Sequence, residues 1–437
     1  MLSDSYGRVA TDLRVSLTDR CNLRCAYCMP PEGLDWLPAP EVLTGDEIVR
    51  LIRIGVELLG IREVRFTGGE PLLRRELESI IARTAALSPR PEMSLTTNGI
   101  GLARRATALR DAGLDRINVS LDTLRPEVFR KLARRDRLSD VLDGLAAAAA
   151  TGLTPVKVNA VLMRGINDDE AVPLLAWCLE RGYELRFIEQ MPLDAQHGWK
   201  RAEMVTAAEV FDSLSAAFLL SEDSQRARGA APAETFLVNG GPARVGVIAS
   251  VTRPFCGSCD RVRLTADGQV RNCLFARTEN DLRSALRSDA TDAEIADQWR
   301  AAVAAKLPGH GINDPSFLQP DRPMSAIGGL VPSASLGRLL GEDQVVGRGI
   351  DGDGRAGIVE GEPLAARRGV HHLHHLRLRG VGGVRVGGVR GVGDLHHPLT
   401  VDPRDRALGL ALGAARDLAE AAQQGLHLAQ PGERAEI

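Results

Sequence analysis

Residues 12–28 read DLRVSLTDRCNLRCAYC, and this stretch indicates how the fold begins. It begins with a short run of β-branched and apolar residues and leads at once into three cysteines, Cys21, Cys25 and Cys28. Functional side chains typically sit in the loops at the carboxyl ends of parallel strands. We therefore expect the first strand of a parallel sheet here, with the three thiols in the loop at its carboxyl end.

Five further strand-like runs follow, and helical segments separate them. The six runs lie at residues 12–17, 63–67, 93–97, 116–121, 156–162 and 184–190. Strands that alternate with helices indicate a parallel sheet built from βα units. Helix starts agree with this pattern, since Thr44 and Glu47 have capping-box spacing and Pro126 suits a first helical position. For residues 1–200 the sequence predicts an α/β fold, a partial βα barrel of six strands.

The alternation of strands and helices ends near residue 200. Residues 201–329 contain two capped helix starts, a Gly/Ala/Pro-rich stretch and a second group of cysteines, which predicts a smaller α+β C-terminal domain. Residues 330–437 have no Cys, Lys, Phe, Trp or Tyr. Because such a segment cannot supply large buried side chains, we expect a low-complexity, disordered tail with one helix near residues 404–428.

Charge and composition narrow the function classes. Lys and Arg total 54 against 57 Asp and Glu, a formal net charge of -3, which argues against a nucleic-acid binder acting through overall charge. The N-terminus has no basic-then-apolar signal region, and no stretch approaches the roughly 18 apolar residues of a membrane span. A cytoplasmic location without nucleic acid or membrane as partner is expected.

The first cysteine group has the spacing C-x3-C-x2-C, which lets three thiolates converge on one small object. Cytosolic cysteines grouped this tightly are more often metal ligands than disulfide partners. A cubane iron–sulfur cluster takes four ligands, so three cysteines leave one iron open. Zinc is the alternative, but a structural zinc site takes four protein ligands and no His lies nearby. The seventh cysteine, Cys178, lies on an apolar helical pattern that predicts core packing.

Cys256, Cys259 and Cys273 form the second group. The third member is distant in sequence, but strand-like runs flank Asp267-Gly268, a strong signal for a two-residue hairpin turn. In that register Val262 pairs with Cys273, and the hairpin returns Cys273 to the other two cysteines. Three ligands again suit a cluster with an open iron better than they suit zinc.

The first motif, with Tyr27 just before its third cysteine, resembles the signature of the radical S-adenosylmethionine superfamily. The resemblance implies a 4Fe-4S cluster that binds S-adenosylmethionine at its open iron and, when reduced, cleaves it to methionine and a 5'-deoxyadenosyl radical. TGGEP at 67–71 resembles the superfamily's methionine-binding motif, and Glu70 is a candidate partner for an ammonium group. The implied S-adenosylmethionine site consists of Tyr27, Gly69, Ser120 and Met191.

The two cysteine motifs together resemble the GTP 3',8-cyclase family of molybdenum cofactor biosynthesis, from about Arg14 to Gly329. The resemblance implies two 4Fe-4S clusters, with the open iron of the second binding the guanine base of GTP. It also implies a lyase reaction, in which the radical removes the 3' hydrogen of GTP and the carbon radical attacks C8 of guanine. The product implied by the resemblance is (8S)-3',8-cyclo-7,8-dihydroguanosine 5'-triphosphate, which would make this the first step of molybdopterin synthesis.

A triphosphate substrate requires several cations, so this nearly neutral chain should carry a local basic pocket. Arginines on separate strands could converge inside a barrel, although a buried Arg taken singly is more often a satisfied salt bridge. With the resemblance, the substrate-binding set is Arg14, Arg65, Thr96, Lys157, Arg261, Val262 through its backbone, and Arg263. The protein would place the reactants and exclude water, and no acid or base can be named.

The resemblance also implies partners. The product would pass to the cyclic pyranopterin monophosphate synthase, and a flavodoxin or ferredoxin would supply electrons. The oligomeric state stays open, with a homodimer as one option. Two other interpretations of the motifs also stay open: a peptide-modifying radical S-adenosylmethionine enzyme with an auxiliary cluster, and a non-enzymatic metal-binding module.

The family pattern ends in a free Gly-Gly that reaches toward the active site, whereas here residues 330–437 follow Gly328-Gly329. We expect the extension to hinder the seating of this Gly-Gly and to lower cyclisation without preventing cluster assembly. The measurement is product formation by the full chain beside a chain stopped after Gly329. An equally active or more active full chain would contradict the hypothesis.

Overall fold

The structure, a computed structural model, describes residues 1–224 and 228–327. The described residues all belong to one compact unit. Gly328-Gly329, the predicted tail at 330–437 and its helix near 404–428 lie outside the described residues. Within the described part of the chain, no helix is long and apolar enough to cross a lipid bilayer.

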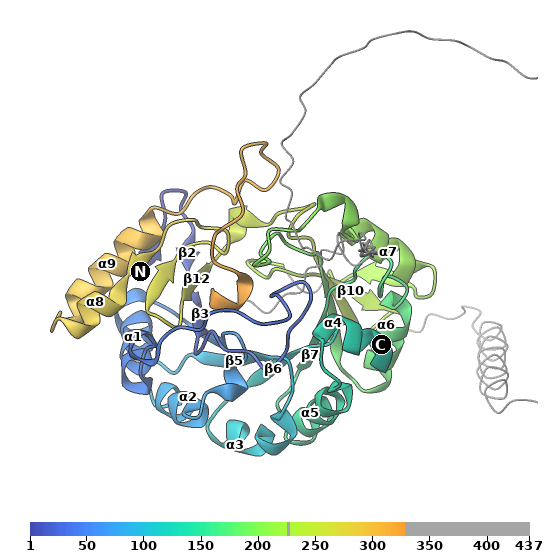
Figure 1. Ribbon diagram of the computed structural model, residues 1–437, viewed down its shortest axis with the longest axis horizontal. Helices are drawn as coiled ribbons and strands as arrows, with labels where there is room; N and C mark the ends of the chain where they lie inside the picture. Colours follow the sequence, from blue (N-terminus) through green and yellow to red (C-terminus); the bar gives the residue numbers. More distant parts are fainter. Residues whose placement is uncertain (225–227, 328–437) are drawn as a thin grey trace, which may run out of the picture. The chain divides into compact units, whose positions relative to one another are not determined.

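Eight neighbouring strands of the large sheet run parallel (Figure 1). Each of the six runs singled out in the sequence forms a strand, and these strands lie side by side in chain order. They are β3 (Asp12–Ser16), β4 (Glu63–Thr67), β5 (Glu92–Thr97), β6 (Arg116–Ser120), β7 (Val156–Ala160) and β8 (Glu184–Ile188). Two later strands complete the parallel set, with β12 (Arg261–Leu264) beside β3 and β11 (Arg244–Ile248) beside β8.

The strands from the C-terminal part extend this same sheet at both edges. Beyond β11 lie β10 (Glu234–Val238) and β9 (Leu220–Glu222), and beyond β12 lie β13 (Gln269–Arg271) and β14 (Asn280–Asp281), all antiparallel. A separate pair consists of β1 (Leu2–Ser3) and β2 (Val9–Ala10). Because β11 pairs directly with β8, the sheet itself marks no boundary near residue 200.

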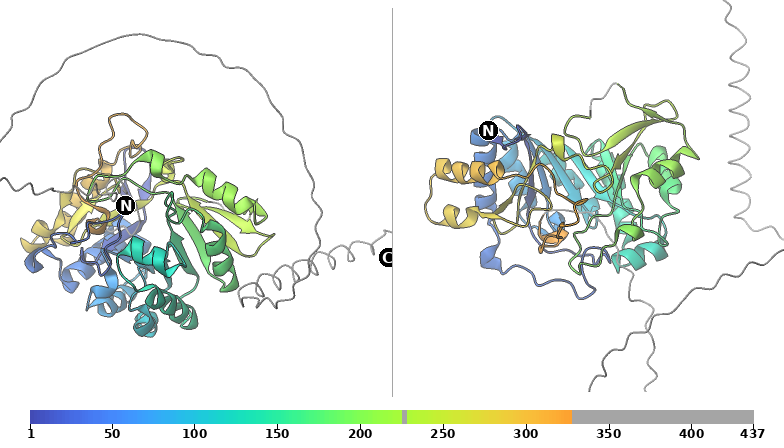
Figure 2. Two further views of the ribbon diagram at one scale, coloured as in Figure 1. Left: turned by 45° about the vertical axis from the view of Figure 1, so that its right-hand side comes forward. Right: turned by 90° about the horizontal axis from the view of Figure 1, so that it is seen from above.

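Helices surround the outside of the curved sheet, as Figures 1 and 2 show. They are α1 (Gly45–Leu59), α2 (Leu77–Ala85), α3 (Ala106–Asp111), α4 (Pro126–Ala133), α5 (Leu138–Ala150), α6 (Ala171–Glu180), α7 (Ala207–Ser215), α8 (Leu282–Arg287) and α9 (Asp292–Ala304). The capping boxes that begin α1, α7 and α9 are formed on both sides, and Pro126 is the first residue of α4. Local sequence signals therefore set these helix starts.

Alternate side chains along a strand lie either in the apolar core or in a cavity on the inner face of the curved sheet. On β3, Leu13 and Val15 are fully buried in the main apolar core, while Arg14 between them lines an inner cavity. On β12, Val262 belongs to that same core and its neighbours Arg261 and Arg263 line the cavity. Because successive side chains of a strand point to opposite faces, apolar residues meet the helices and arginines gather inside. Cys178 is fully buried in the core, as predicted.

The hairpin between β12 and β13 differs from its predicted register. Its paired residues are Arg263 with Arg271 and Leu264 with Val270, which leaves a loop of three residues, not two, after Thr265. Gly268 is left-handed at φ 80°, and Thr265 Oγ1 lies 2.6 Å from Asp267 Oδ1. A left-handed glycine closing a three-residue loop is a common hairpin connection. The predicted pairing of Val262 with Cys273 is therefore wrong, and Cys273 lies beyond the end of β13.

Candidate active site

The first cysteine group lies in the loop after β3. Its members line one cavity, and three of the four residues predicted for S-adenosylmethionine line it with them: Tyr27, Gly69 and Ser120. The Tyr27 hydroxyl donates to Asp122 Oδ2 at 2.7 Å, and Asp122 also lines the cavity. Met191 lines a second cavity that is described below, and its contact with the cosubstrate stays a prediction.

The TGGEP loop packs directly against the cysteine loop through its backbone. Gly69 N donates to Thr18 O at 2.7 Å, and Glu70 N donates to Arg20 O at 2.7 Å. A Cβ atom on Gly69 would lie 2.3 Å from the carbonyl oxygens of Asp19 and Arg20. Glycine is thus required here by close approach of two backbones.

Glu70 makes its hydrogen bonds with the protein. Its carboxylate accepts from Thr97 Oγ1 at 2.6 Å, from Asn98 N at 2.7 Å and from Leu72 N at 2.9 Å. Its side chain is fully buried, and burial raises the pKa of Glu70 to about 7. These contacts tie the loop to the end of β5, and they give no support to a contact between Glu70 and a cosubstrate ammonium group.

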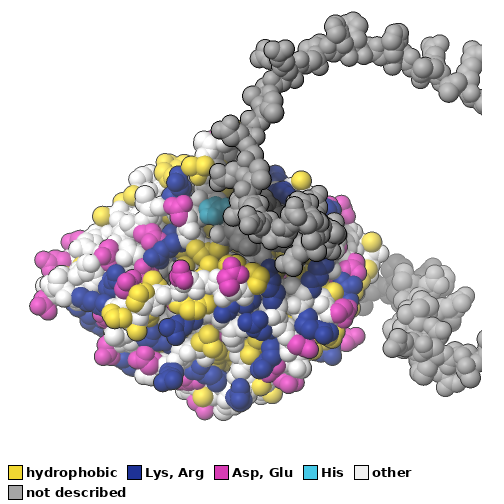
Figure 3. Space-filling view, viewed as in Figure 1, with side chains coloured by type: hydrophobic (Ala, Val, Ile, Leu, Met, Phe, Trp, Pro, Cys, Tyr) yellow, Lys and Arg dark blue, Asp and Glu magenta, His cyan; other side chains and the backbone are white. Residues whose placement is uncertain are grey.

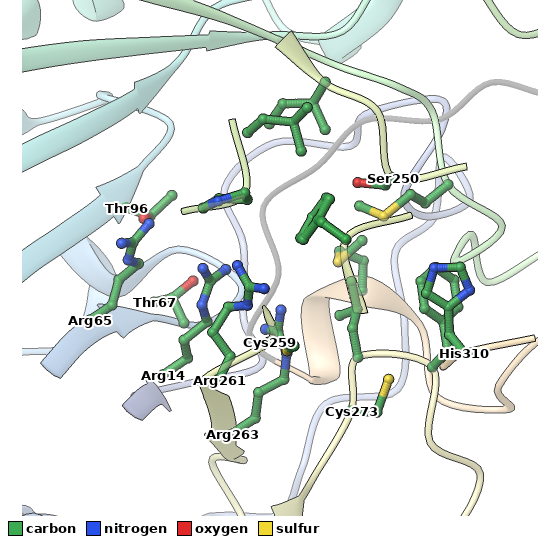
Figure 4. Close-up of a pocket in the computed structure, with 18 of the residues that line it drawn as sticks. Arg14, Arg65, Thr67, Thr96, Ser250, Cys259, Arg261, Arg263, Cys273 and His310 are labelled. Atoms are coloured by element: carbon green, nitrogen blue, oxygen red, sulfur yellow. The ribbon is translucent and has the colours of Figure 1, made fainter. Parts of the chain in front are cut away.

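The second cysteine group borders a larger cavity, shown in Figure 4. The cavity encloses about 1120 Å³, counting space open to solvent. All three cysteines line it together with five of the seven residues predicted for the substrate: Arg14, Arg65, Thr96, Arg261 and Arg263. In Figure 4 the labelled arginines approach one another on one side, and Cys273 and His310 lie on the other. Cys259 is drawn beside the arginines, so the cations and the cysteines meet within one cavity.

Two predicted substrate residues do not line this cavity in the structure. Lys157 on β7 is buried, and its Nζ lies 3.7 Å from Glu184 Oε2. Val262 points its side chain into the apolar core, so only its backbone, as predicted, could face a ligand. Both residues stay predictions as substrate contacts.

Two arginines of the cavity, Arg14 and Arg65, share one carboxylate, that of Asp12. Asp12 Oδ2 lies 3.5 Å from Arg14 Nη2 and 3.9 Å from Arg65 Nη2. Burial, together with repulsion from Arg14, lowers the pKa of Arg65 to about 9. Buried N–H groups of Arg14, Arg65 and Arg261 have no hydrogen-bond partner among the described residues. Crowded cations with unused donors favour binding of a multiply charged anion.

Arg186 is a cavity residue that the sequence reasoning missed. It lies on β8, bonds Glu184 Oε1 through two nitrogens at 2.9 and 3.0 Å, and lines the cavity with Asn159 and Ser250. Its position could have been found, because period-two alternation along ELRFI puts Arg186 on one face and the fully buried Leu185 on the other.

On the face of the described residues seen in Figure 3, Lys/Arg and Asp/Glu side chains are intermixed. The cationic cluster is thus an internal feature of a chain whose formal net charge is -3. This arrangement suits a small anion that enters a cavity better than a polyanion that lies across a surface.

The two cysteine groups lie in different electrostatic surroundings. Burial, with the nearby Glu70 carboxylate, raises the pKa of Cys21 to about 12, and burial raises the pKa of Cys28 to about 11. Burial acts to raise the pKa of Cys259 as well. The charges of Arg261 and Lys306 outweigh this effect and lower the pKa of Cys259 to about 7.

Each cysteine group offers three thiols, which is one ligand fewer than a structural zinc site takes and the number that a four-iron cluster with one open iron uses. Each group lines one cavity with three unpaired thiols. Among the described residues, no three His, Cys, Asp or Glu side chains are arranged to hold one metal ion. In a four-iron cluster each cysteine binds a different iron, and the fourth iron is left to another ligand.

A short 3-10 turn, η6 (Met324–Ala326), lies between the two cavities. Met324 lines the cavity of the second cysteine group, and Ser325 lines the cavity of the first. Ser325 also lies close enough to Cys28 to oppose the effect of burial, which raises the pKa of that thiol. The two sites are therefore neighbours that share a wall.

Comparisons with known proteins agree with this geometry. A model of the Radical SAM superfamily matches residues 15–178, and a model of Molybdenum Cofactor Synthesis C matches residues 183–312. The fold and the site thus define a radical S-adenosylmethionine enzyme. The solved structure of SuiB from Streptococcus suis bound to S-adenosylmethionine is similar at a TM-score of 0.49 and 14% identity, covering 68% of each chain.

Relatives with higher identity narrow the class. A GTP 3',8-cyclase of Streptomyces coelicolor is 71% identical over 329 residues, which cover 75% of this chain and 96% of the relative. A GTP 3',8-cyclase of Mycobacterium sp. strain KMS is 63% identical over 328 residues, 75% of this chain and 93% of the relative. The chain belongs to the GTP 3',8-cyclase family, which acts at the first step of molybdenum cofactor synthesis.

Proposed function

We propose that this chain converts GTP and S-adenosylmethionine to (8S)-3',8-cyclo-7,8-dihydroguanosine 5'-triphosphate, 5'-deoxyadenosine and methionine. The observation that carries the proposal is the second cavity, where three cysteines and a set of inward arginines line one space. A nucleoside triphosphate offers several negative charges for the arginines and a base for the open iron of a cluster on these cysteines. The proposed fold assignment is a partial βα barrel whose C-terminal part holds the second cluster.

Two 4Fe-4S clusters are part of the proposal. Cys21, Cys25 and Cys28 would hold the first, and Cys256, Cys259 and Cys273 the second. When bound, the first cluster supplies the means to cleave S-adenosylmethionine and generate a 5'-deoxyadenosyl radical. Tyr27, Gly69 and Ser120, which line the first cavity, would position that cosubstrate.

The arginines bind and orient the triphosphate. The cavity arginines come from four strands, β3, β4, β8 and β12, so several strands contribute contacts to the anion. These arginines are Arg14, Arg65, Arg186, Arg261 and Arg263. Planar guanidinium groups bind phosphate oxygens with defined direction, which fixes the nucleotide against the shared wall at Met324. Fixed placement of this kind lowers the entropic part of the barrier and keeps water from a reactive radical.

Anaerobic incubation of the reduced, cluster-loaded chain with GTP and S-adenosylmethionine tests the proposal. A GTP-dependent 3',8-cyclised product is expected. Iron and sulfide analysis accompanies it, with about eight of each per chain expected for two four-iron clusters. Radical formation with no cyclised nucleotide in the presence of GTP would favour a peptide-modifying enzyme, and stoichiometric zinc without sulfide would favour a metal-binding module.

Replacing Arg186 with methionine should weaken GTP binding. The change removes a charged donor from the cavity, and loss of one such hydrogen bond costs about 1.5–3 kcal/mol, so KM for GTP should rise roughly tenfold or more. Arg137→Met is the matched control, because Arg137 is exposed and pairs with Asp140 on the surface. Steady-state kinetics at equal iron content provide the measurement, and an unchanged KM would remove Arg186 from the substrate site.

Other parts of the proposal rest on the family resemblance. They are the cytoplasmic location, electron transfer from a flavodoxin or ferredoxin, and transfer of the product to the cyclic pyranopterin monophosphate synthase. The division into residues 1–200 and 201–329 is proposed on the same ground, with the first part binding S-adenosylmethionine and the second binding the auxiliary cluster and GTP.

A further inference from the structure

Lys306 places a buried ammonium group against a cysteine of the second group. It follows the end of α9 and is 5% exposed. Its Nζ lies 3.3 Å from Cys259 Sγ, 3.3 Å from Cys259 O and 3.1 Å from Arg261 O. Lys306 itself does not line the arginine cavity, although Cys259 and Arg261, which it contacts, do.

The three neighbours account for the hydrogen-bonding capacity of Lys306. An ammonium group has three N–H donors, and the two carbonyls and the sulfur are three acceptors. No carboxylate of the described residues lies within ion-pair distance of Lys306. A buried charge is costly without a counter-charge, so the sulfur of Cys259 is the neighbour that can supply it.

The first cysteine group has a different partner. There Asn98, a neutral amide, places its Nδ2 3.9 Å from Cys21 Sγ. A buried carboxylate, Glu70, lies near the same thiol. Its negative charge disfavours the thiolate form of Cys21, whereas a cation would favour it. The chain thus gives a cationic donor to the second group and a weaker, neutral donor to the first.

We propose that Lys306 is a positioning residue for the second cluster, and that its ammonium group donates to Cys259 Sγ and raises the reduction potential of that cluster. The proposal rests on the proposed function, which assigns Cys259 as a cluster ligand. Hydrogen bonds to the ligand sulfurs and nearby charge set the potential of iron–sulfur clusters. A fixed positive charge favours the reduced, more negative cluster.

The test isolates the second cluster in the full chain. A Cys21→Ala/Cys25→Ala/Cys28→Ala background removes the first group, and Lys306→Met then removes the ammonium group at similar side-chain length. We expect the ratio of reduced to oxidised second cluster to fall about tenfold at a given potential, which is about 59 mV for a one-electron couple. Redox titration followed by electron paramagnetic resonance measures the shift.

Two further variants separate charge from structure. Lys306→Arg keeps a cationic donor and should restore most of the potential, whereas Lys306→Gln keeps a neutral donor and should not. Lys200→Met is the matched control, because Lys200 is exposed and pairs with Glu203. If only the neutral variants lose iron from the second site, that loss also supports the contact.

An unchanged potential in Lys306→Met and Lys306→Gln, with iron and sulfide retained, would overturn the role of Lys306. An equal shift in Lys306→Arg would overturn it as well, since the effect would then follow packing and not charge. Failure of the proposed function looks different. In that case the parent chain itself, with Lys306 in place, would bind no second cluster.

Discussion

Replacing Cys21 with alanine is expected to reduce formation of 5'-deoxyadenosine below detection. Cys21 is one of three thiols that line the first cavity, and a cluster with an open iron has no spare protein ligand. Cyclised product should vanish with it, because cosubstrate cleavage precedes every later step. Chromatographic measurement of 5'-deoxyadenosine under anaerobic, reducing conditions reports the result.

Cys273→Ala should abolish the cyclised product but keep some formation of 5'-deoxyadenosine. Cys273 lines the second cavity and does not line the first. S-adenosylmethionine cleavage should therefore continue at a reduced, uncoupled level. The guanine end of the substrate would lose its anchor, and no cyclised product is expected. The measurement is therefore the ratio of 5'-deoxyadenosine to cyclised product, which should rise without limit in this variant.

Cys178→Ala is the matched control for both changes. Cys178 is a fully buried core residue on α6 and lines neither cavity. This variant should keep both clusters and both activities, with a modest loss of stability from the smaller side chain. Equal loss of radical formation in Cys21→Ala and Cys273→Ala, with each fold intact and the other cluster loaded, would contradict separate tasks for the two groups.

Regular alternation is the reason that much of the fold and of the arginine cavity could be predicted. The same period of two that marks DLRVS as a strand also turns Arg14 inward between Leu13 and Val15. Arg186 obeys this rule and could have been found by it. Short-range patterns of this kind need no knowledge of the rest of the chain.

Features that depend on contacts between residues far apart in the chain could not be predicted from such short-range patterns. The second cysteine group reaches the cavity because β12 pairs with β3, which lies some 250 residues earlier in the chain. The contact between Lys306 and Cys259 likewise depends on how α9 packs against β13 and β14, which are close to it in space. The predicted hairpin register was wrong for a local reason. The hydrogen bond between the side chains of Thr265 and Asp267 favours a longer loop than the Asp-Gly pair alone suggests.

The TGGEP loop and the cysteine loop form one unit, and this contact leads to a prediction at Gly69. The backbone of Gly69 is bonded to Thr18, and the carbonyls of Asp19 and Arg20 leave no room for a side chain. Both sides of the contact are main chain, so neither can move as a flexible side chain would. One methyl group at this position should therefore displace the loop that carries Cys21.

Gly69→Ala is accordingly expected to lose most iron from the first site and to lower S-adenosylmethionine cleavage at least a hundredfold, while the second site stays loaded. A Cβ atom 2.3 Å from two carbonyl oxygens is well inside the 3.0 Å that real Cβ atoms respect. Gly182→Ala is the control, because Gly182 is left-handed but its Cβ would meet open space, so only about 1–2 kcal/mol of backbone strain is added. Iron content of each site, separated by their paramagnetic spectra, decides the outcome. Normal loading of the first site in Gly69→Ala would mean that the two loops can part without releasing the cluster, and that Gly69 serves the cosubstrate alone.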